Sequence, residues 1–168
     1  MAMLWHTGQD RKYSETPYIS HPIAVMEIVR EVSDNETMLM TAVLHDVIED
    51  NERVTDELVR REFGGDVADL VGWLTDVSKP EDGNRSVRKR IDREHTAASP
   101  AAAKTIKLAD LIHNTESITK CDPDFAVVYM HEKALLLEVL KDGDSTLWNR
   151  AHLSLQSYQQ AQLQKALE

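Results

Sequence analysis

The sequence of 168 residues contains a single cysteine, Cys121, and it lacks any long hydrophobic run. One thiol cannot form an internal disulfide, and such a low cysteine content fits a reducing compartment. No apolar stretch approaches the roughly 20 residues that cross a bilayer, and the chain does not open with the charged and then apolar pattern of a signal peptide. These absences predict a soluble, cytoplasmic protein.

Positive charge is also scarce, because 29 acidic residues outnumber 19 lysines and arginines and give a net charge of −10. General binding to nucleic acid or to an anionic membrane needs a basic face, so the composition argues against both kinds of partner. A small anionic ligand stays open, because basic residues gather at Arg11–Lys12 and in the stretch 85–93. Nothing in the sequence specifies an oligomeric state.

Strand patterns are missing as well, because no segment of any length alternates apolar and polar residues, whereas every long segment has helical spacing. A chain of this length suits one domain with a substantial core, and we find no internal repeat or low-complexity linker. The sequence therefore predicts one all-α domain, residues 1–168, of about eight helices. After the end of a short helix at residues 3–5, the expected helices cover about 22–32, 37–50, 55–63, 66–75, 85–96, 100–120, 125–141 and a last segment from 145 onward.

Cap residues suggest where several of these helices begin. Pro22 suits a first helical turn, with Ser20 or His21 as the cap. Thr55 is followed by two acids, which favour the positive end of a helix dipole. We also expect Ser99–Pro100 to begin the longest helix and Ser145 to cap the last one.

The stretch that says most about function is 41–51, TAVLHDVIEDN, where an apolar helical run carries a histidine and three carboxylates. On one continuous helix, residues three and four apart lie side by side, so we expect His45 beside Glu49 and Asp46 beside Asp50. Imidazole and carboxylate suit Mn, Fe, Zn or Mg, and the later acids could act on a metal-bound water. The alternative is an amphipathic helix whose acids face water. The metal interpretation is favoured, because an unpartnered His-Asp pair at the edge of a core is costly.

Two further residues could complete such a site. Asp110 lies among apolar neighbours in KTIKLADLIHN, so it needs either a bound cation or a salt bridge to Lys107 or Lys104. His21 by itself would be a capping or surface histidine. With the His-Asp pair above, these residues would supply two imidazoles and two carboxylates and leave positions for water and substrate, as in a catalytic site. The spacing alone leaves their convergence open.

Five segments, HTGQDRK, TPYISHP, AVLHDVIED, FGGDVADLVGWLT and IKLADLIHN, occur in this order and resemble the HD-type hydrolase domain of the RelA/SpoT family. The resemblance runs from His6 to about Lys120. HD alone is a weak signal, whereas HDxxED with YIxHP upstream and KLADxxxN downstream is specific. The run RKRIDREHTAASPAAAKTIKLAD and the short loop before it are most similar to the stand-alone small alarmone hydrolases, including the metazoan SpoT homologues.

This resemblance implies an HD-domain helical bundle that acts as a manganese-dependent 3′-pyrophosphohydrolase on (p)ppGpp-like nucleotides. Matched by position, the site residues fall into three groups. The implied metal ligands are His21, His45, Asp46 and Asp110; the implied acids that position and deprotonate the attacking water are Glu49 and Asp50; and the implied substrate-binding residues are Arg11, Lys12, Arg85 and Asn114.

Three departures from the family pattern keep alternatives open. The family usually has a longer first helix, the loop KYSETPY lacks the usual glycine, and Glu116 stands where an arginine is common. The last difference bears on guanine against adenine recognition. The alternatives are an HD phosphohydrolase on another nucleotide, such as (p)ppApp, NADPH or a nucleoside monophosphate, and a non-catalytic nucleotide-binding HD module. Retention of Glu49 and Asp50 argues against the latter, because a pure binder does not need them.

Overall fold

The computed structural model describes residues 1–13 and 16–167, so the middle of the KYSETPY loop lies outside the described part. Within that part there are ten α-helices, one 3-10 helix and no strand apart from a single bridge between Asp10 and Pro17. The all-α prediction is confirmed. Eight of the helices are longer than a single turn, in line with the expected number. The elements are α1 (Ala2–Trp5), α2 (Ser20–Arg30), α3 (Glu36–Leu44), α4 (Val47–Asp50), α5 (Asp56–Phe63), α6 (Gly65–Leu74), η1 (Pro80–Asp82), α7 (Arg85–Ala98), α8 (Ala101–Cys121), α9 (Pro123–Val139) and α10 (Ser145–Leu167).

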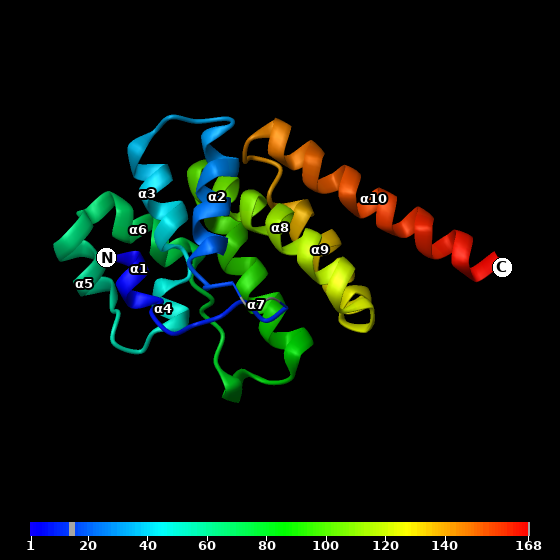
Figure 1. Ribbon diagram of the computed structural model, residues 1–168, viewed down its shortest axis with the longest axis horizontal. Helices are drawn as coiled ribbons and strands as arrows, with labels where there is room; N and C mark the ends of the chain where they lie inside the picture. The colour runs from blue at the N-terminus through cyan, green and yellow to red at the C-terminus, as the bar shows by residue number, and fades with distance from the viewer. Residues whose placement is uncertain (14–15, 168) are drawn as a thin grey trace.

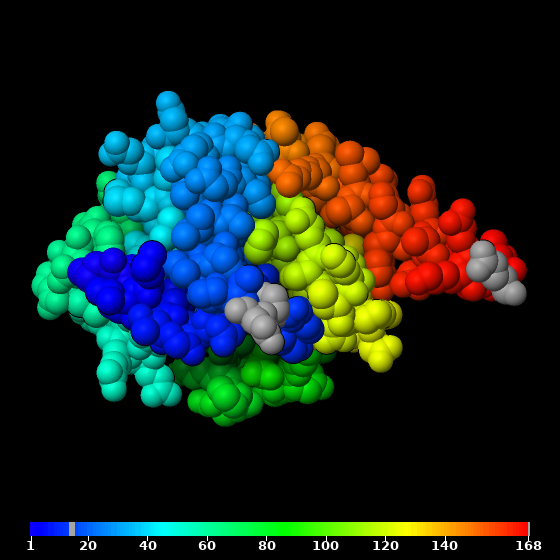
Figure 2. Space-filling model, in the orientation of Figure 1, coloured from blue at the N-terminus to red at the C-terminus, as the bar shows by residue number. Residues whose placement is uncertain are grey.

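Helix α8 is the central element of the bundle. It packs against α2, α3 and α6 on one side and against α9 and α10 on the other (Figure 1). Its predicted inward positions are all buried, namely Ile106, Leu108, Ala109, Ile112 and Ile118. A second, smaller apolar cluster joins α1 to the segment from α3 to α6. Helix α10 continues past the rest of the molecule at its C-terminal end (Figures 1 and 2), and none of the helices in the described ranges is long and apolar enough to cross a membrane.

The expected continuous helix over residues 37–50 is wrong, because α3 ends at Leu44 and α4 begins only at Val47. The backbone of Asp46, with φ −100° and ψ −3°, stays in the right-handed region but departs from the ideal helix values of about −63° and −42°. Nδ1 of His45 lies 2.8 Å from the carbonyl oxygen of Ala42. In a continuing helix that carbonyl would accept the amide of Asp46, so the imidazole takes the acceptor that the next turn needs. The buried residues Leu44 and Val47 anchor the two sides of the break in the smaller apolar cluster.

Most expected helix starts are found, but three caps differ. Thr55 caps α5 as predicted, since its hydroxyl accepts the amide of Leu58. Helix α2 starts earlier than expected, so Ser20 and His21 lie inside it and the N-cap is Ile19 without a side-chain bond. The hydroxyl of Ser99 donates to Thr96 at the end of α7 instead of capping α8. Asp144, not Ser145, caps α10, because a carboxylate oxygen accepts two amides of the first turn at 2.9 and 3.0 Å.

Candidate metal centre

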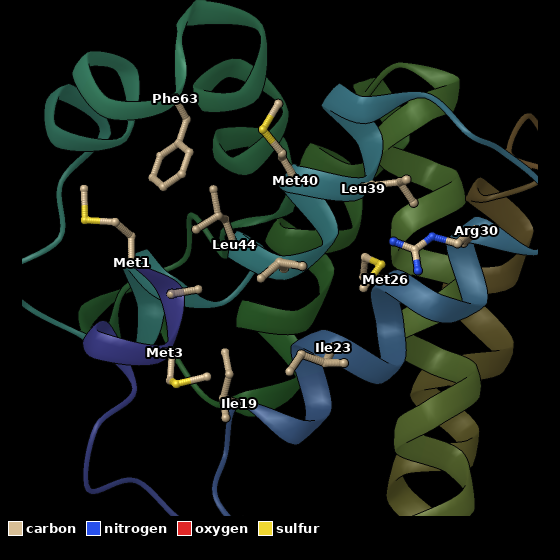
Figure 3. A pocket seen from close by; sticks show the side chains of 12 residues that line it. Met1, Met3, Ile19, Ile23, Met26, Arg30, Leu39, Met40, Leu44 and Phe63 are labelled. Atoms are coloured by element: carbon tan, nitrogen blue, oxygen red, sulfur yellow. The ribbon is translucent and has the colours of Figure 1, made fainter.

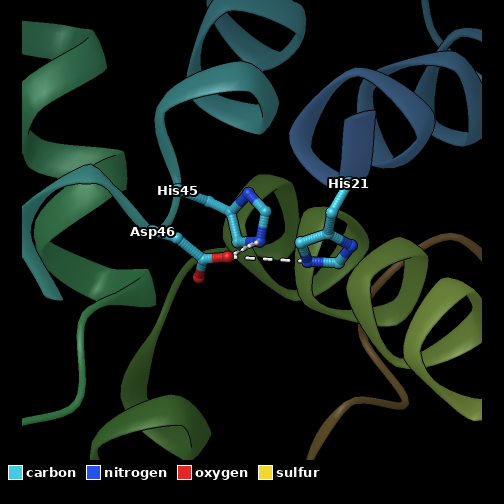
Figure 4. A group of neighbouring side chains, drawn as sticks. All are labelled: His21, His45 and Asp46. Atoms are coloured by element: carbon cyan, nitrogen blue, oxygen red, sulfur yellow. Dashed lines mark ion pairs between the residues drawn. The ribbon is translucent and has the colours of Figure 1, made fainter. Parts of the chain in front are cut away.

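Four side chains from three parts of the fold meet between α2, the break after α3, and α8. Nε2 of His21 lies 3.5 Å from Oδ2 of Asp46 and 3.3 Å from Oδ1 of Asp110. Nε2 of His45 lies 3.0 Å and 3.8 Å from the same two oxygens. Donor atoms of His21, His45 and Asp46 all fall within 4.8 Å of one another (Figure 4). The structure therefore brings together the four residues that the sequence suggested as ligands.

The environment of His45 tests whether a cation fits this cluster. The ring is 1% exposed. A carbonyl oxygen can only accept, so Nδ1 of His45 donates to Ala42 and the neutral ring keeps its lone pair on Nε2. That Nε2 is buried and forms no hydrogen bond with any described residue, although Asp46 is in contact with it. A buried nitrogen lone pair facing two carboxylates is what a divalent ion would satisfy, so the residues fit a metal.

Neighbouring groups hold both carboxylates in place. Tyr18 donates its hydroxyl to Oδ2 of Asp46 at 2.6 Å. Asn114 donates its amide to Oδ1 of Asp110 at 2.6 Å, and Nζ of Lys107 lies 3.1 Å from Oδ2 of the same residue. The salt bridge from Asp110 to Lys107 is therefore present, and Oδ1 of Asp110 still faces the two histidines. Lys104, the other possible partner, instead binds Asp142 at 2.9 Å.

Electrostatics favour a positive charge at this point. Burial by itself would raise the pKa of Asp46 and of Asp110, but His45 beside the first and Lys107 beside the second keep both pKa values well below the usual range. Burial would likewise lower the pKa of His45, yet the two carboxylates raise it to about 10. The two carboxylates thus favour a positive charge beside them, supplied either by a proton on His45 or by a bound cation that takes the place of that proton.

The two acids proposed to handle water lie on α4, after the break. The backbone amide of Asp76 donates to Oε1 of Glu49 at 2.7 Å. The Glu49 side chain is exposed, yet nearby protein atoms remove part of the water around its carboxylate. This effect and the charge of Asp76 outweigh the charge of Lys107 and raise the pKa of Glu49 to about 7. Burial and the charge of Asp46 also raise the pKa of Asp50. Although α3 and α4 are separate helices, Asp46 and Asp50 keep the spacing of one helical turn, because the amide of Asp50 donates to the carbonyl oxygen of Asp46 at 2.9 Å.

The four predicted substrate-binding residues fall into two pairs. Arg11 donates from Nη2 to Oδ1 of Asn114 at 3.2 Å, so this pair is tied directly to Asp110. Lys12 and Arg85 come from segments far apart in the sequence but lie over the same aromatic ring. Nζ of Lys12 is 5.2 Å and Cζ of Arg85 is 5.3 Å from the centre of the Phe125 ring. Arg85 also binds Glu132 through two bonds of 2.7 and 2.8 Å. The structure places this second pair at the edge of the site, without a contact to the ligands.

A family model described as an HD domain matches residues 1–136. The chain belongs to the HD domain family. It is 38% identical over 125 residues to human guanosine-3′,5′-bis(diphosphate) 3′-pyrophosphohydrolase MESH1, a match that spans 71% of this chain and 66% of the human protein. It is 38% identical over 119 residues to the GTP pyrophosphokinase of Streptomyces coelicolor, spanning 70% of this chain and 14% of that protein.

Solved structures agree with this assignment of the HD domain. One, described as a metazoan ortholog of SpoT that hydrolyzes ppGpp and plays a role in starvation responses, matches with a TM-score of 0.82 and 32% identity over 94% of this chain and 90% of that one. A Listeria monocytogenes EGD-e protein shares the fold, with a TM-score of 0.71 at 23% identity over 88% of this chain and 98% of that one. The resemblance to the SpoT-type HD hydrolases is confirmed.

Two residues of this HD domain site were missed in the sequence, Tyr18 and His113, whereas Lys107 was named there as a possible partner of Asp110. Nδ1 of His113 lies 2.7 Å from Nδ1 of His21. Burial, together with the nearby charge of Arg11, lowers the pKa of His113 to about 4, so this ring is neutral at pH 7. A signal was present, because His113 follows Asp110 by three residues and Lys107 precedes it by three, which places all three on one face of α8.

Size alone would not locate the HD domain site. An apolar hollow of about 450 Å³ lies between α1, α2, α3 and α5 and is lined mainly by methionine, isoleucine and leucine (Figure 3). It shares no residue with the ligand set. Two other hollows border the site: one of about 500 Å³ beside Gln9 and Asp50, and one of about 50 Å³ beside Asp76 and Lys107. The chemistry of the side chains, not the volume of the hollow, identifies the site.

Proposed function

We propose that this protein is a metal-dependent 3′-pyrophosphohydrolase of (p)ppGpp-type nucleotides. The observation that carries the proposal is the convergence of two imidazoles and two carboxylates beside two acids of raised pKa. The human and metazoan relatives are named for hydrolysis of this nucleotide class, and the chain spans 66% of the human protein and 90% of the solved metazoan chain. The proposal also includes a cytoplasmic location, which the single exposed thiol of Cys121 supports.

In this proposal His21, His45, Asp46 and Asp110 hold the ion, with Mn²⁺ as the physiological metal. A mixed imidazole and carboxylate set suits Mn²⁺ among the divalent ions of intermediate hardness. When bound, such an ion lowers the pKa of water and polarises a phosphoryl oxygen.

Glu49 and Asp50 position and deprotonate the attacking water. A carboxylate with a pKa of about 7 is well matched to accept a proton near neutral pH, because general bases work best when their pKa is close to the working pH. The water oxygen bonds to the phosphorus attached to the 3′ oxygen while an acid of this pair takes a proton from the water. The bond between that phosphorus and the 3′ oxygen breaks, the 3′ oxygen gains a proton and becomes a hydroxyl, and pyrophosphate and the nucleotide without its 3′ phosphates are the products.

The basic residues neutralise the charge of the nucleotide. Asn114 donates to Asp110 and Arg11 donates to Asn114, so both would contact phosphate or ribose close to the reacting group. Lys12 and Arg85 flank Phe125 further out and would meet the more distant phosphates. Arg85 must exchange its bond to Glu132 for a phosphate oxygen to do so.

The test is turnover of purified, manganese-loaded protein against ppGpp, ppApp, NADPH and nucleoside monophosphates, with identification of the products. Release of pyrophosphate from ppGpp is the expected result. Release from ppApp instead would show that the enzyme prefers adenine over guanine. Orthophosphate from NADPH would replace the proposed activity by a phosphatase. No turnover of any substrate despite bound metal would leave a nucleotide-binding module. Glu52→Gln, which alters an exposed acid close to the site, is the matched control for Glu49→Gln.

A further inference from the structure

The two histidines His21 and His113 share one hydrogen. Their Nδ1 atoms are 2.7 Å apart, with ring centres 4.9 Å apart and ring planes inclined by 31°. Two lone pairs would repel at this distance and two hydrogens would clash, so one ring donates and the other accepts. His21 comes from α2 and His113 from α8, so the bond also links the two helices that supply ligands on either side of the site.

The direction of this bond follows from the other nitrogen of His21. Nε2 of His21 faces Asp46 and Asp110 at 3.5 and 3.3 Å, and as a metal ligand it has to offer a lone pair. A neutral imidazole carries one hydrogen, which must then be on Nδ1 and point at His113. His45 behaves in the same way, because its Nδ1 donates to the carbonyl of Ala42. In both proposed ligand histidines, Nδ1 therefore donates a hydrogen bond that fixes the ring, and Nε2 points its lone pair toward the two carboxylates.

We infer that His113 is a positioning residue of the metal centre, which accepts the Nδ1 hydrogen of His21 and so fixes the tautomer and ring orientation in which Nε2 can bind the ion. The inference rests on the proposed metal centre. Ligand histidines usually donate to a carboxylate, a carbonyl or water, and losing that partner typically costs about 10–100-fold in metal affinity. Here a second imidazole takes that place, and it lies on the same face of α8 as Asp110.

The experiment compares substitutions that keep or remove the acceptor. In His113→Asn the amide oxygen stands at the same number of bonds from Cα as Nδ1, so it can still accept. His113→Leu has similar volume and no acceptor, and His113→Met is a more flexible apolar replacement should the leucine variant not fold. His131→Leu, at an exposed histidine of α9, is the matched control. Free Mn²⁺ is measured by electron paramagnetic resonance during titration of each variant.

The expected result is a loss of about 10–100-fold in Mn²⁺ affinity for the leucine and methionine variants and wild-type affinity for the asparagine and control variants. A second readout is the ¹⁵N spectrum of the Zn²⁺-loaded protein, where the Nδ1 hydrogen of His21 should be protected from exchange in the wild type and exposed in the leucine variant. Wild-type affinity and an unchanged His21 tautomer in the apolar variants would overturn the role of His113 while the metal centre stands. Failure of the wild-type protein itself to bind Mn²⁺ would overturn both.

Discussion

Buried charged side chains lie against two faces of helix α8, and the cost of burying them is compensated differently at each face. Toward α2, Asp110 meets two histidines and Lys107, so opposite charges surround one another. On the face toward α9 and α10, the buried charge is Lys133 of α9, which is 1% exposed. Among the described residues, its ammonium donates to the hydroxyls of Thr115 on α8 and Ser154 on α10, at 2.8 and 2.7 Å. No ion pair of Lys133 is found within residues 1–13 and 16–167.

The comparison shows how to tell a functional buried charge from a tolerated one. In the metal cluster, burial is outweighed by opposite charges, and the pKa values of both carboxylates stay low. At Lys133 nothing offsets burial, which lowers its pKa to about 8. A single buried cation can become neutral at modest cost, whereas two facing carboxylates need a cation. Substitutions on each face should therefore act on different properties of the protein.

The largest effect is expected from Asp110→Asn, which keeps the size of the side chain but removes its charge. Losing a ligand should cost more than losing an outer partner, so we expect metal affinity to fall by more than about 100-fold and turnover to disappear. Metal content by mass spectrometry and turnover of ppGpp measure both. Asp142→Asn, an exposed acid that binds Lys104, serves as control, and unchanged metal content in Asp110→Asn would remove this residue from the ligand set.

Glu49→Gln and Asp50→Asn should separate catalysis from metal binding. We expect turnover to fall by about 10²–10⁴-fold, the usual contribution of a positioned acid or base, while metal content stays at the wild-type level. The check is kcat measured alongside bound metal. Full turnover in both variants would contradict the water-activating role of α4.

Lys133→Met should act on stability alone. Both hydroxyls keep a partner after the substitution, since Thr115 donates to Leu111 and Ser154 to Ala151, so removal of a buried ammonium should stabilise the fold by about 1–3 kcal/mol at pH 7. The folded pKa lies below the ordinary 10.5, so the wild type binds fewer protons folded than unfolded between about pH 8 and 10.5 and gains stability as the pH rises through that window.

Urea unfolding at pH 7 and pH 10 tests this prediction, with Lys120→Met at an exposed site as control. The stability advantage of Lys133→Met should shrink at the higher pH. A large loss of stability at both pH values would show that the two hydroxyl bonds outweigh the cost of burial.

The smallest effect is expected on the acidic side, or limb, of the pH profile of kcat, where turnover rises with pH. Glu49 must be deprotonated to accept a proton, so turnover should rise through about pH 7. The charge of Asp76 helps to raise that pKa, and Asp76→Asn should therefore move the limb to lower pH by less than about one unit. The pH dependence of kcat measures the shift, with Glu81→Gln on the same loop as control. A limb that stays in place would rule out Glu49 as the group that titrates.

The sequence predicted the helices because they depend on spacing and composition, whereas spacing left the convergence of the four-residue cluster open and the family resemblance implied it. The apolar positions of α8 identify it as the central helix, and HD, YIxHP and KLAD segments point to the ligands. The break at His45 was not predictable from spacing, because a side chain there competes with the backbone for one carbonyl. The contacts of Lys12 and Arg85 around Phe125, and the interior position of Lys133, depend on how α9 and α10 pack, which no local pattern contains.

The interruption between α3 and α4 sets a condition for anyone who wants to transplant this site. Consecutive side chains on an ideal helix diverge by about 100°, so an HD pair grafted onto a regular designed helix would direct its two donor groups away from one another. A workable scaffold would have to include the two-residue step, the acceptor carbonyl at the end of the first helix, and apolar anchors on both sides of the step. The unit to copy is thus the bend together with its pair of residues.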